Sequence, residues 1–248
     1  MFLLSLLVIL PSLHVLAQDA ATPEATAIDA STLPNLNGRE VTIAVENAYP
    51  PYNSLDTNNK GVGWDYDTFN DICKAINCKP VFQQMAWEGM LLGVSQGSVD
   101  VAADGITYTD ERAQTVDFGS LYQSYDETLL VRADETRFSS ADELKLIPNY
   151  VVGTQIGTTN EITSHKLFGD ANVKSYDQFP VAVQALLNKD VDAVEVDRPA
   201  AEGFILAQGG LKTLTESLNG VEGLAFAYTK GSDLVAPINA AMAYLQST

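Results

Sequence analysis

The chain of 248 residues contains few of the side chains that common metal and enzymatic sites need. Histidine occurs only as His14 and His165, and cysteine only as Cys73 and Cys78. A histidine-rich metal site is therefore excluded, and with no second cysteine pair a four-ligand zinc site is excluded too. Of the two histidines, only His165 lies beyond the N-terminal apolar run and could pair with a nucleophile.

Positive charge is also scarce. Lysine and arginine number 14 against 32 aspartates and glutamates, which gives a formal net charge of -18. Nucleic-acid phosphates and anionic lipids attract basic surfaces, so neither is expected as a partner. Hydrophobic residues make up 46% of the chain and charged residues 19%, which predicts a packed core in one or two domains.

Only the N-terminus carries a long apolar run, MFLLSLLVILPSLHVL, and no other run approaches the ~20 residues that span a bilayer. Pro11 and the small residues Val15 and Ala17 favour a removable signal peptide over 1–17 rather than a membrane anchor or a core helix. Residues 18–38 are rich in Ala, Thr and Pro and predict a flexible lead-in. We therefore expect an exported bacterial protein, in the periplasm or on the extracellular face of the membrane.

Export makes a disulfide between Cys73 and Cys78 plausible, and two buried free thiols are the alternative. The bridge would join the end of a helix to the start of a strand. It would close a small loop and contribute about 2 kcal/mol at most.

From Arg39 onward, short β-rich runs alternate with helical patterns. Phe69, Ile72, Cys73 and Ile76, for example, recur at the spacing of one helix face. Strands are expected over 40–46, 81–85, 99–103, 127–132, 150–153, 173–176, 191–196 and 224–228, and helices over 65–77, 87–94, 159–168, 179–188, 199–208 and 234–245. This alternation predicts an α/β fold of parallel sheets with helices on both faces.

The sequence also contains an internal echo. QGSVDVAADG at 96–105 is similar to NKDVDAVEVD at 188–197, since each reads as a helix end, a tight turn and a buried strand opened by Val-Asp. Two similar α/β units are therefore expected. Ligands bind outside the carboxyl ends of such strands, which places Gly105 and Asp197 on opposite sides of one cleft.

An ordered set of motifs carries a family resemblance along the chain after the lead-in. The motifs are AYPPYN at 48–53, GVGWDYD at 61–67, QGSVDVAADGITYTDER at 96–112, VDFGSLY at 116–122, VGTQIGTTNE at 152–161 and DVDAVEVD at 190–197. Together they resemble the solute-binding proteins of amino-acid ABC transporters, specifically the polar amino-acid family.

This resemblance implies a two-lobed type II periplasmic-binding-protein fold with two hinge strands. Lobe 1 would comprise 39–126 and 224–248 and lobe 2 would comprise 127–223, with crossings near Glu127 and Gly223. Such a protein is not an enzyme and needs no cofactor. It captures a free amino acid by hinge closure and, as a monomer, delivers it to the permease of an ABC importer.

Arg112 is the expected partner of the ligand carboxylate, because a guanidinium bonds both oxygens at once. The alternative is a surface pairing with Asp110 or Asp117. Thr107 and the backbone N–H at Gly105 or Thr107 add donors. Across the cleft, Thr158 and Thr159 open a helix whose free N–H groups attract a carboxylate, although either threonine could simply cap that helix. In the resembled family, the position of Thr159 closes over the carboxylate that Arg112 holds.

Asp197 is the expected partner of the ligand ammonium, because it ends a buried strand where the resembled family has its amine-binding acid. Glu195 leaves the same face of that strand, and two neighbouring carboxylates oppose each other's ionisation unless a cation lies between them. The alternative for Asp197 is to cap the helix that starts at Pro199.

The ligand side chain is expected among residues of lobe 1. Tyr49 and Trp87 occupy positions that cover it in the resembled family, and Tyr52 is either part of the lining or of the core, as is Trp87. Three acids also map near this pocket: Glu46, Asp65 and Asp104. Buried acids are costly without a cation, so a cationic amino acid such as arginine, lysine or ornithine is predicted. The alternatives are that Asp65 caps a helix, Asp104 holds loop amides and Glu46 is solvated.

Two other functions remain open at this point. A cyclohexadienyl dehydratase has the same scaffold and needs a general acid in the cleft, for which Glu195 is the candidate. The sensory domain of a receptor is the other possibility.

Overall fold

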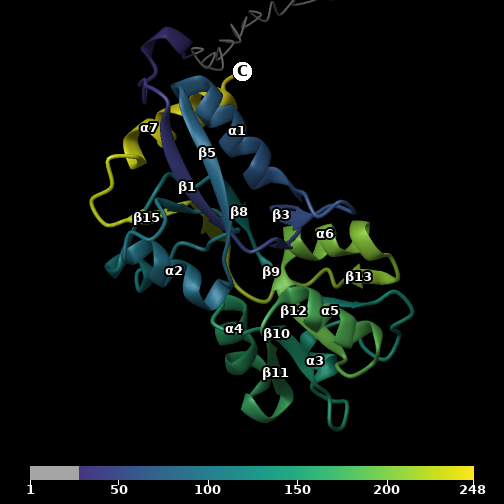
Figure 1. The fold of residues 1–248 in the computed structure, drawn as a ribbon. Coiled ribbons are helices and arrows are strands. Elements are labelled where there is room, and N and C mark those ends of the chain that lie inside the picture. Colours follow the sequence, from purple (N-terminus) through teal and green to yellow (C-terminus); the bar gives the residue numbers. More distant parts are fainter. Residues whose placement is uncertain (1–27) are drawn as a thin grey trace, which may run out of the picture.

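The computed structural model describes residues 28–248, so the expected signal peptide over 1–17 and the first part of the lead-in lie outside the described residues. The described chain folds into two lobes, each built on a five-stranded sheet (Figure 1). No helix within 28–248 combines the length and the apolarity needed to cross a membrane. The predicted two-lobed α/β fold is confirmed.

Lobe 1 contains the N-terminal elements and the C-terminal helix, drawn in purple, blue and yellow in Figure 1. Its sheet has the order β5 (Cys78–Gln84), β1 (Arg39–Val45), β6 (Val101–Ala102), β15 (Ala227–Thr229) and β7 (Val116–Phe118). Its helices are α1 (Trp64–Ile76), α2 (Trp87–Ser95) and α7 (Val235–Gln246).

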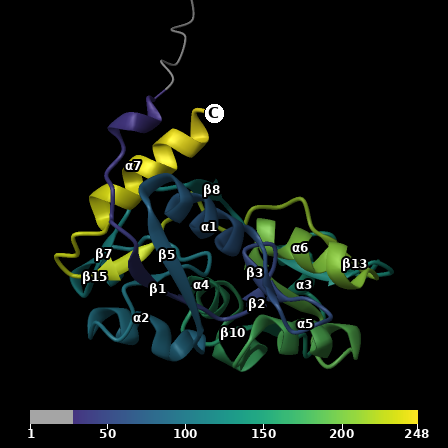
Figure 2. The same cartoon turned by 45° about the horizontal axis from the view of Figure 1, so that its top comes forward.

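Side chains on alternate faces of β1 explain why helices cover both sides of this sheet. Val41, Ile43 and Val45 pack in one core cluster with residues of α1 and α7, and these two helices lie side by side (Figure 2). Ala44 points the other way, into a cluster formed with α2. The helix periodicity predicted for α1 is confirmed, since Phe69, Ile72, Cys73 and Ile76 are all buried.

Lobe 2 has an equivalent sheet. Its strand order is β11 (Val173–Tyr176), β10 (Val152–Gln155), β12 (Ala193–Asp197), β9 (Glu127–Arg132) and β13 (Leu211–Thr213). Its helices are α3 (Ala141–Leu144), α4 (Thr159–Phe168), α5 (Phe179–Leu187) and α6 (Arg198–Gln208). Val194 and Val196 of β12 face a core shared with α5 and α6. Glu195 and Asp197 alternate with these valines and therefore face the side of α4.

Parallel sheets were predicted, but both sheets are mixed. β1 runs parallel to β5 and β6, and β10 runs parallel to β11 and β12, but β15 and β9 pair antiparallel with their neighbours. The reason lies at the crossings between the lobes. There, β8 (Gln123–Tyr125) and β14 (Glu222–Leu224) pair antiparallel, and the strand that follows each crossing enters its sheet against the βαβ direction.

The sequence did not predict a small sheet at the lobe boundary. β2 (Ala48–Tyr49), β3 (Asn53–Leu55) and β4 (Gly61–Val62) form an antiparallel three-stranded sheet. β7, β8, β13, β14, α3 and the short 3-10 helices η1 (Ala30–Thr32) and η3 (Asp170–Asn172) were also not predicted. All are short, so they carry little periodicity.

Two features hold the start of lobe 1 together. Cys73 and Cys78 form a disulfide, as predicted, and no free thiol is left in the described chain. The last part of the expected flexible lead-in is packed instead, since the N–H of Leu36 donates to the carbonyl oxygen of Ile76 at 2.8 Å and Leu36 contacts the core. Apolar leucines at 33 and 36 provide the surface for this packing.

Candidate functional site

A cavity lies between the lobes, and its lining includes Asp104, which follows β6, and Asp197, which ends β12. All the predicted site residues except Glu46, Tyr52 and Asp65 line it. The lining is Tyr49, Trp87, Asp104, Gly105, Thr107 and Arg112 from lobe 1, and Gln155, Thr158, Thr159, Asn160, Phe179 and Asp197 from lobe 2. Gln155, Asn160 and Phe179 were not predicted.

Arg112 begins the 3-10 helix η2 (Arg112–Gln114), where its backbone N–H donates to Thr109 Oγ1 at 3.1 Å. One guanidinium nitrogen, Nη1, donates to the Thr107 carbonyl at 2.9 Å. Among residues 28–248, no carboxylate lies within salt-bridge distance of the guanidinium and no group accepts from Nε or Nη2. Asp117 pairs with Lys230 instead, so the alternative of a surface arginine is not observed.

Burial lowers the pKa of Arg112 below its usual range, but a guanidinium stays charged in proteins. Its Cζ atom lies 5.2 Å from the ring centre of Trp87, within reach of a cation–π contact. Lobe 1 thus presents a fixed positive charge with unused donors to the cavity.

The Gly157-Thr158-Thr159 turn supplies the facing wall. Thr158 is the N-cap of α4: its Oγ1 accepts from the N–H of Glu161 at 3.1 Å, and Glu161 Oε2 accepts from the N–H of Gly157 at 2.8 Å. These two bonds, one to the N-cap side chain and one to the residue before it, fix the shape of the turn. Thr158 takes the capping role, and Thr159 Oγ1 lies 3.3 Å from Thr107 Oγ1 across the cavity.

Asp197 is 2% exposed and does not cap α6 with its side chain, contrary to the alternative considered from sequence. It accepts from Asn160 Nδ2 at 2.8 Å instead. Burial raises its pKa to about 6, against the opposing effect of hydrogen bonds from Tyr49 and Asn160. The carboxylate is therefore mostly ionised at neutral pH and faces the same cavity as Arg112.

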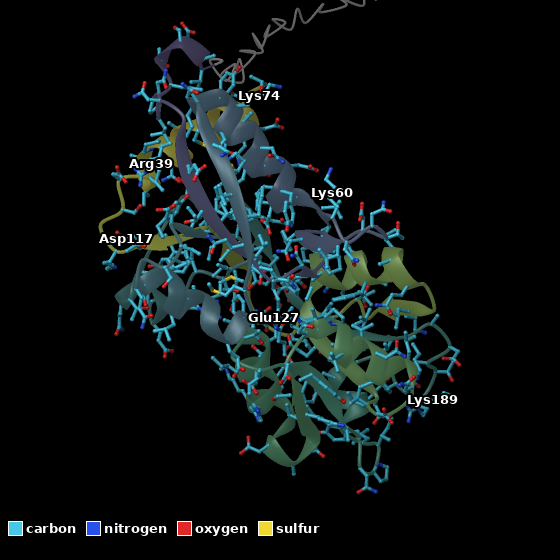
Figure 3. The ribbon with its side chains drawn as sticks, viewed as in Figure 1. Arg39, Lys60, Lys74, Asp117, Glu127 and Lys189 are labelled. Atoms are coloured by element: carbon cyan, nitrogen blue, oxygen red, sulfur yellow. A yellow bond between two sulfur atoms is a disulfide. The ribbon has the colours of Figure 1, made fainter. Side chains whose placement is uncertain are left out.

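Two more carboxyl groups lie behind Asp197. Glu195 is fully buried and accepts from Ser164 Oγ at 3.2 Å, and burial with the nearby Glu127 raises its pKa. Glu127, labelled near the lobe junction in Figure 3, pairs with Asp197 on the adjacent strand. No described group lies within hydrogen-bond distance of its carboxyl oxygens. Burial raises its pKa to about 7, against the smaller opposing effect of the nearby Thr163 and Glu195 side chains. Neither glutamate lines the cavity, which does not favour Glu195 as the general acid of a dehydratase.

Aromatic rings close one side of the cavity. Tyr49 stacks between Tyr52 and Phe179, with ring centres 5.7 and 5.2 Å away. Trp87 is 9% exposed, belongs to the core of lobe 1 and lines the cavity, and its Nε1 donates to the Gly157 carbonyl at 3.1 Å. Tyr52 is a core residue, because its ring is buried and its hydroxyl donates to Gln123 at 3.0 Å.

The three predicted acids of lobe 1 have different positions. Asp104 lines the cavity, but Glu46 and Asp65 do not. The Glu46 carboxylate is occupied by the Gln155 amide, whose Nε2 lies 3.0 and 3.1 Å from its two oxygens. Asp65 is fully buried behind Asn53. Burial raises the pKa of all three, that of Asp65 to about 7.

Within the described residues, no group of three or more His, Cys, Asp or Glu side chains is arranged to hold a metal ion. The cavity therefore offers one guanidinium, two carboxylates, hydroxyls and aromatic faces. This set complements a small molecule that carries both charges.

Known proteins provide an independent comparison. The "Probable histidine-binding protein" of Neisseria gonorrhoeae is 28% identical over 190 residues, which cover 76% of this chain and 66% of that protein, just under two thirds of its length. A solved structure of the arginine-, lysine-, histidine-binding protein ArtJ from Geobacillus stearothermophilus is 27% identical, with a TM-score of 0.77 over 84% of this chain and 90% of that one.

A second structure, of an ancestral arginine-binding protein bound to arginine, is 31% identical, with a TM-score of 0.76 over 85% of this chain and 93% of that one. A family description matches residues 41–248, nearly the whole described chain. The chain therefore belongs to family 3 of the bacterial extracellular solute-binding proteins.

Proposed function

We propose that this protein captures a free α-amino acid with a cationic side chain by closing its two lobes. The observation that carries the proposal is the pairing of opposite charges across one cavity. An unpaired guanidinium, Arg112, lines it from lobe 1, and a buried carboxylate, Asp197, lines it from lobe 2. An α-amino acid carries the matching carboxylate and ammonium.

The ligand carboxylate would bind Nε and Nη2 of Arg112, with the hydroxyls of Thr107 and Thr159 on either side. The ammonium would bind Asp197, whose orientation is fixed by Asn160. The free N–H groups at the start of α4 add a favourable field for the carboxylate.

The side chain would extend toward Asp104, the second carboxylate of the lining. Burial raises the pKa of Asp104, and a neutral zwitterion that matches Arg112 and Asp197 would leave the negative charge of an ionised Asp104 unbalanced. A cationic side chain balances that charge. The names of the similar proteins, which include arginine- and histidine-binding proteins, support this choice.

Closure of the two lobes would prepare the bound amino acid for delivery. Ligand contacts from both lobes favour the closed arrangement, since only that arrangement brings Arg112 and Asp197 to the same molecule. The closed surface would then be read by the permease of an ABC importer. We expect the exported protein to act outside the cytoplasmic membrane as a monomer, after removal of residues 1–17.

Isothermal titration calorimetry with the twenty amino acids, ornithine and citrulline tests the proposal. Arginine, lysine or ornithine should bind most tightly, and Arg112→Ala should weaken that binding about 100-fold, because two charge-assisted hydrogen bonds are lost. Arg39→Ala is the matched control, since Arg39 pairs with Asp233 at the far end of lobe 1 (Figure 3). Exclusive binding of neutral or acidic amino acids would refute the cationic class, and an Arg112→Ala affinity within a few-fold of the original would refute the site.

A further inference from the structure

Asp104 has one oxygen that is held and one that is free. Its Oδ1 accepts from Asn53 Nδ2 at 2.5 Å and from the N–H of Glu46 at 3.2 Å. Within 28–248, no group donates to Oδ2. The side chain is 3% exposed and lines the cavity, so the free oxygen is available to a ligand.

Asn53 determines this orientation although it does not line the cavity. The residue is fully buried in β3, and its Oδ1 accepts from the N–H of Asn47 at 2.6 Å. That bond assigns the amide oxygen to one side and directs the NH₂ group toward the acids. The same Nδ2 lies 2.5 Å from Asp104 and 2.8 Å from Asp65.

Asp65 is the second carboxyl group that accepts a hydrogen bond from the Asn53 amide. Its Oδ2 accepts from Asn53, whereas none of the described groups bonds to its buried Oδ1. Two buried carboxyl groups that share one donor cannot both ionise cheaply. The pair therefore favours a single negative charge, and a cation in the cavity can stabilise that charge only on Asp104, the member that faces it.

We propose that Asn53 is a positioning residue for ligand specificity, which holds Asp104 with Oδ2 toward the cavity so that a cationic side chain is preferred over a neutral one of the same shape. When a cation lies in the cavity, Asp65 is the partner that carries the proton of the pair. This inference rests on the proposed capture of a cationic amino acid and adds the residues that would set the preference.

The test compares arginine with citrulline, which has the same shape but a neutral urea in place of the guanidinium. The ratio of the two dissociation constants is measured by calorimetry for Asn53→Ser, Asp104→Asn and the double variant. Both single variants should lower the preference for arginine about tenfold, the size of one charge-assisted hydrogen bond. The double variant should lower it no further, because the two residues act as one unit.

Asn70→Ser is the matched control, since Asn70 is an exposed asparagine of α1 and should leave the ratio unchanged. Equal weakening of arginine and citrulline binding in Asn53→Ser would overturn the proposal, because a merely structural role lowers both affinities alike. An additional loss of preference in the double variant would also overturn it.

Asp65→Asn decides the matter if Asn53→Ser does not fold. This variant removes the competing carboxyl group and should keep or raise the preference for arginine, because the charge then rests on Asp104. A preference that falls toward one would overturn the proposal by placing the discrimination in Asp65. Failure of the unaltered protein to bind any cationic amino acid would instead refute the proposed ligand class, so the two failures are distinguishable.

Discussion

At the scale of single residues, the proposed binding of the ligand ammonium to Asp197 makes affinity depend on pH. Its carboxylate must be ionised to hold an ammonium group, and burial raises its pKa to about 6. A proton and the ligand ammonium therefore compete for the same carboxylate. Above pH 7 this competition is weak. Between pH 6 and 5 binding should weaken about fivefold, and the slope approaches about tenfold for each unit below pH 5.

Citrulline is the suitable ligand for measuring this effect, because its neutral side chain does not draw on the charge of Asp104. Its dissociation constant should be nearly constant between pH 7 and 8 and about fivefold higher at pH 5 than at pH 6. Asp197→Asn should bind weakly at every pH and lose the slope. A flat profile down to pH 5 in the unaltered protein would contradict the assignment of Asp197 to the ammonium.

The sequence identified those residues of the candidate site whose position depends on neighbouring residues in the chain. Arg112 and Thr107 come from one continuous motif, and Thr158 is a helix cap that can be recognised from its own turn. The role of Glu46 could not be predicted, because its partner Gln155 is 109 residues away along the chain. Asn160 follows Thr159 directly, but only the packing of α4 against β12 brings it to Asp197.

At the scale of secondary-structure elements, Gly203 is the point where α6 of lobe 2 meets the Pro50-Pro51 turn of lobe 1. A Cβ atom at Gly203 would lie 2.6 Å from the backbone C and O of Pro50 and 2.8 Å from the N of Pro51. Backbone atoms cannot rotate away as a side chain can. Alanine would therefore push the two lobes apart at this contact.

Gly203→Ala should weaken amino-acid binding about 5- to 150-fold, since overpacking of about 1–3 kcal/mol opposes the closed arrangement. Each lobe should still fold, so circular dichroism should be unchanged. Gly89→Ala is the matched control, because Gly89 is also a helical glycine and a Cβ there meets no atom within 4 Å. Affinity in Gly203→Ala equal to that of Gly89→Ala would contradict a role of this contact in closure.

The similarity between residues 96–105 and 188–197 correctly predicted two equivalent turns, each followed by a buried strand. Asp100 and Asp192 occupy equivalent places in the two repeats, and each holds the neighbouring strand by accepting from a backbone N–H, that of Thr42 at 2.8 Å and that of Val151 at 3.0 Å. Such turns are defined locally, so the sequence reveals them. Strand direction is not local: the antiparallel pairing of β9 and β15 depends on how the chain crosses between lobes, which periodicity does not encode.

At the scale of the whole molecule, buried acids make stability depend on pH. The folded-state pKa values of Asp65 and Glu127 are about 7 and that of Asp197 about 6, whereas unfolded acids titrate near pH 4. Between pH 4 and 7 the folded chain therefore binds more protons than the unfolded chain. Stability must fall as pH rises through this window. Glu135 acts oppositely at low pH, because hydrogen bonds from Arg137 lower its pKa to about 2.

Without added amino acid, the thermal unfolding midpoint should be higher at pH 5 than at pH 8, by about 5 °C or more. Glu127→Gln replaces the partnerless carboxyl group by a neutral amide. It should raise the midpoint at pH 8 and change it little at pH 5. Glu88→Gln, at an exposed glutamate of α2, serves as control and should shift neither value. If the unfolding midpoint of the unaltered protein is higher at pH 8 than at pH 5, the buried acids do not have the raised pKa values on which this prediction rests.

Closure of the two lobes also rests on contacts that need no ligand. Glu46 of lobe 1 accepts from Gln155 at 3.0 and 3.1 Å and from Gln178 at 3.5 Å, and both glutamines belong to lobe 2. The Trp87 indole adds a bond to the Gly157 carbonyl. Since these bonds exist only when the lobes meet, they favour the closed arrangement by an amount independent of the amino acid. Glu46 thus forms hydrogen bonds that join the two lobes.

Glu46→Ala should shift the ligand-free protein toward an open arrangement, because bonds to a charged acceptor worth about 2 kcal/mol are lost. Small-angle X-ray scattering should show a larger radius of gyration without arginine and a return to the original value when arginine saturates the site. Arginine affinity should fall about 30-fold, the same free energy expressed in binding. Glu40→Ala is the matched control, since Glu40 lies on β1, the strand that Glu46 directly follows, but pairs only with Lys79 at the surface. An unchanged radius of gyration together with an affinity within twofold would mean that ligand contacts alone hold the lobes together.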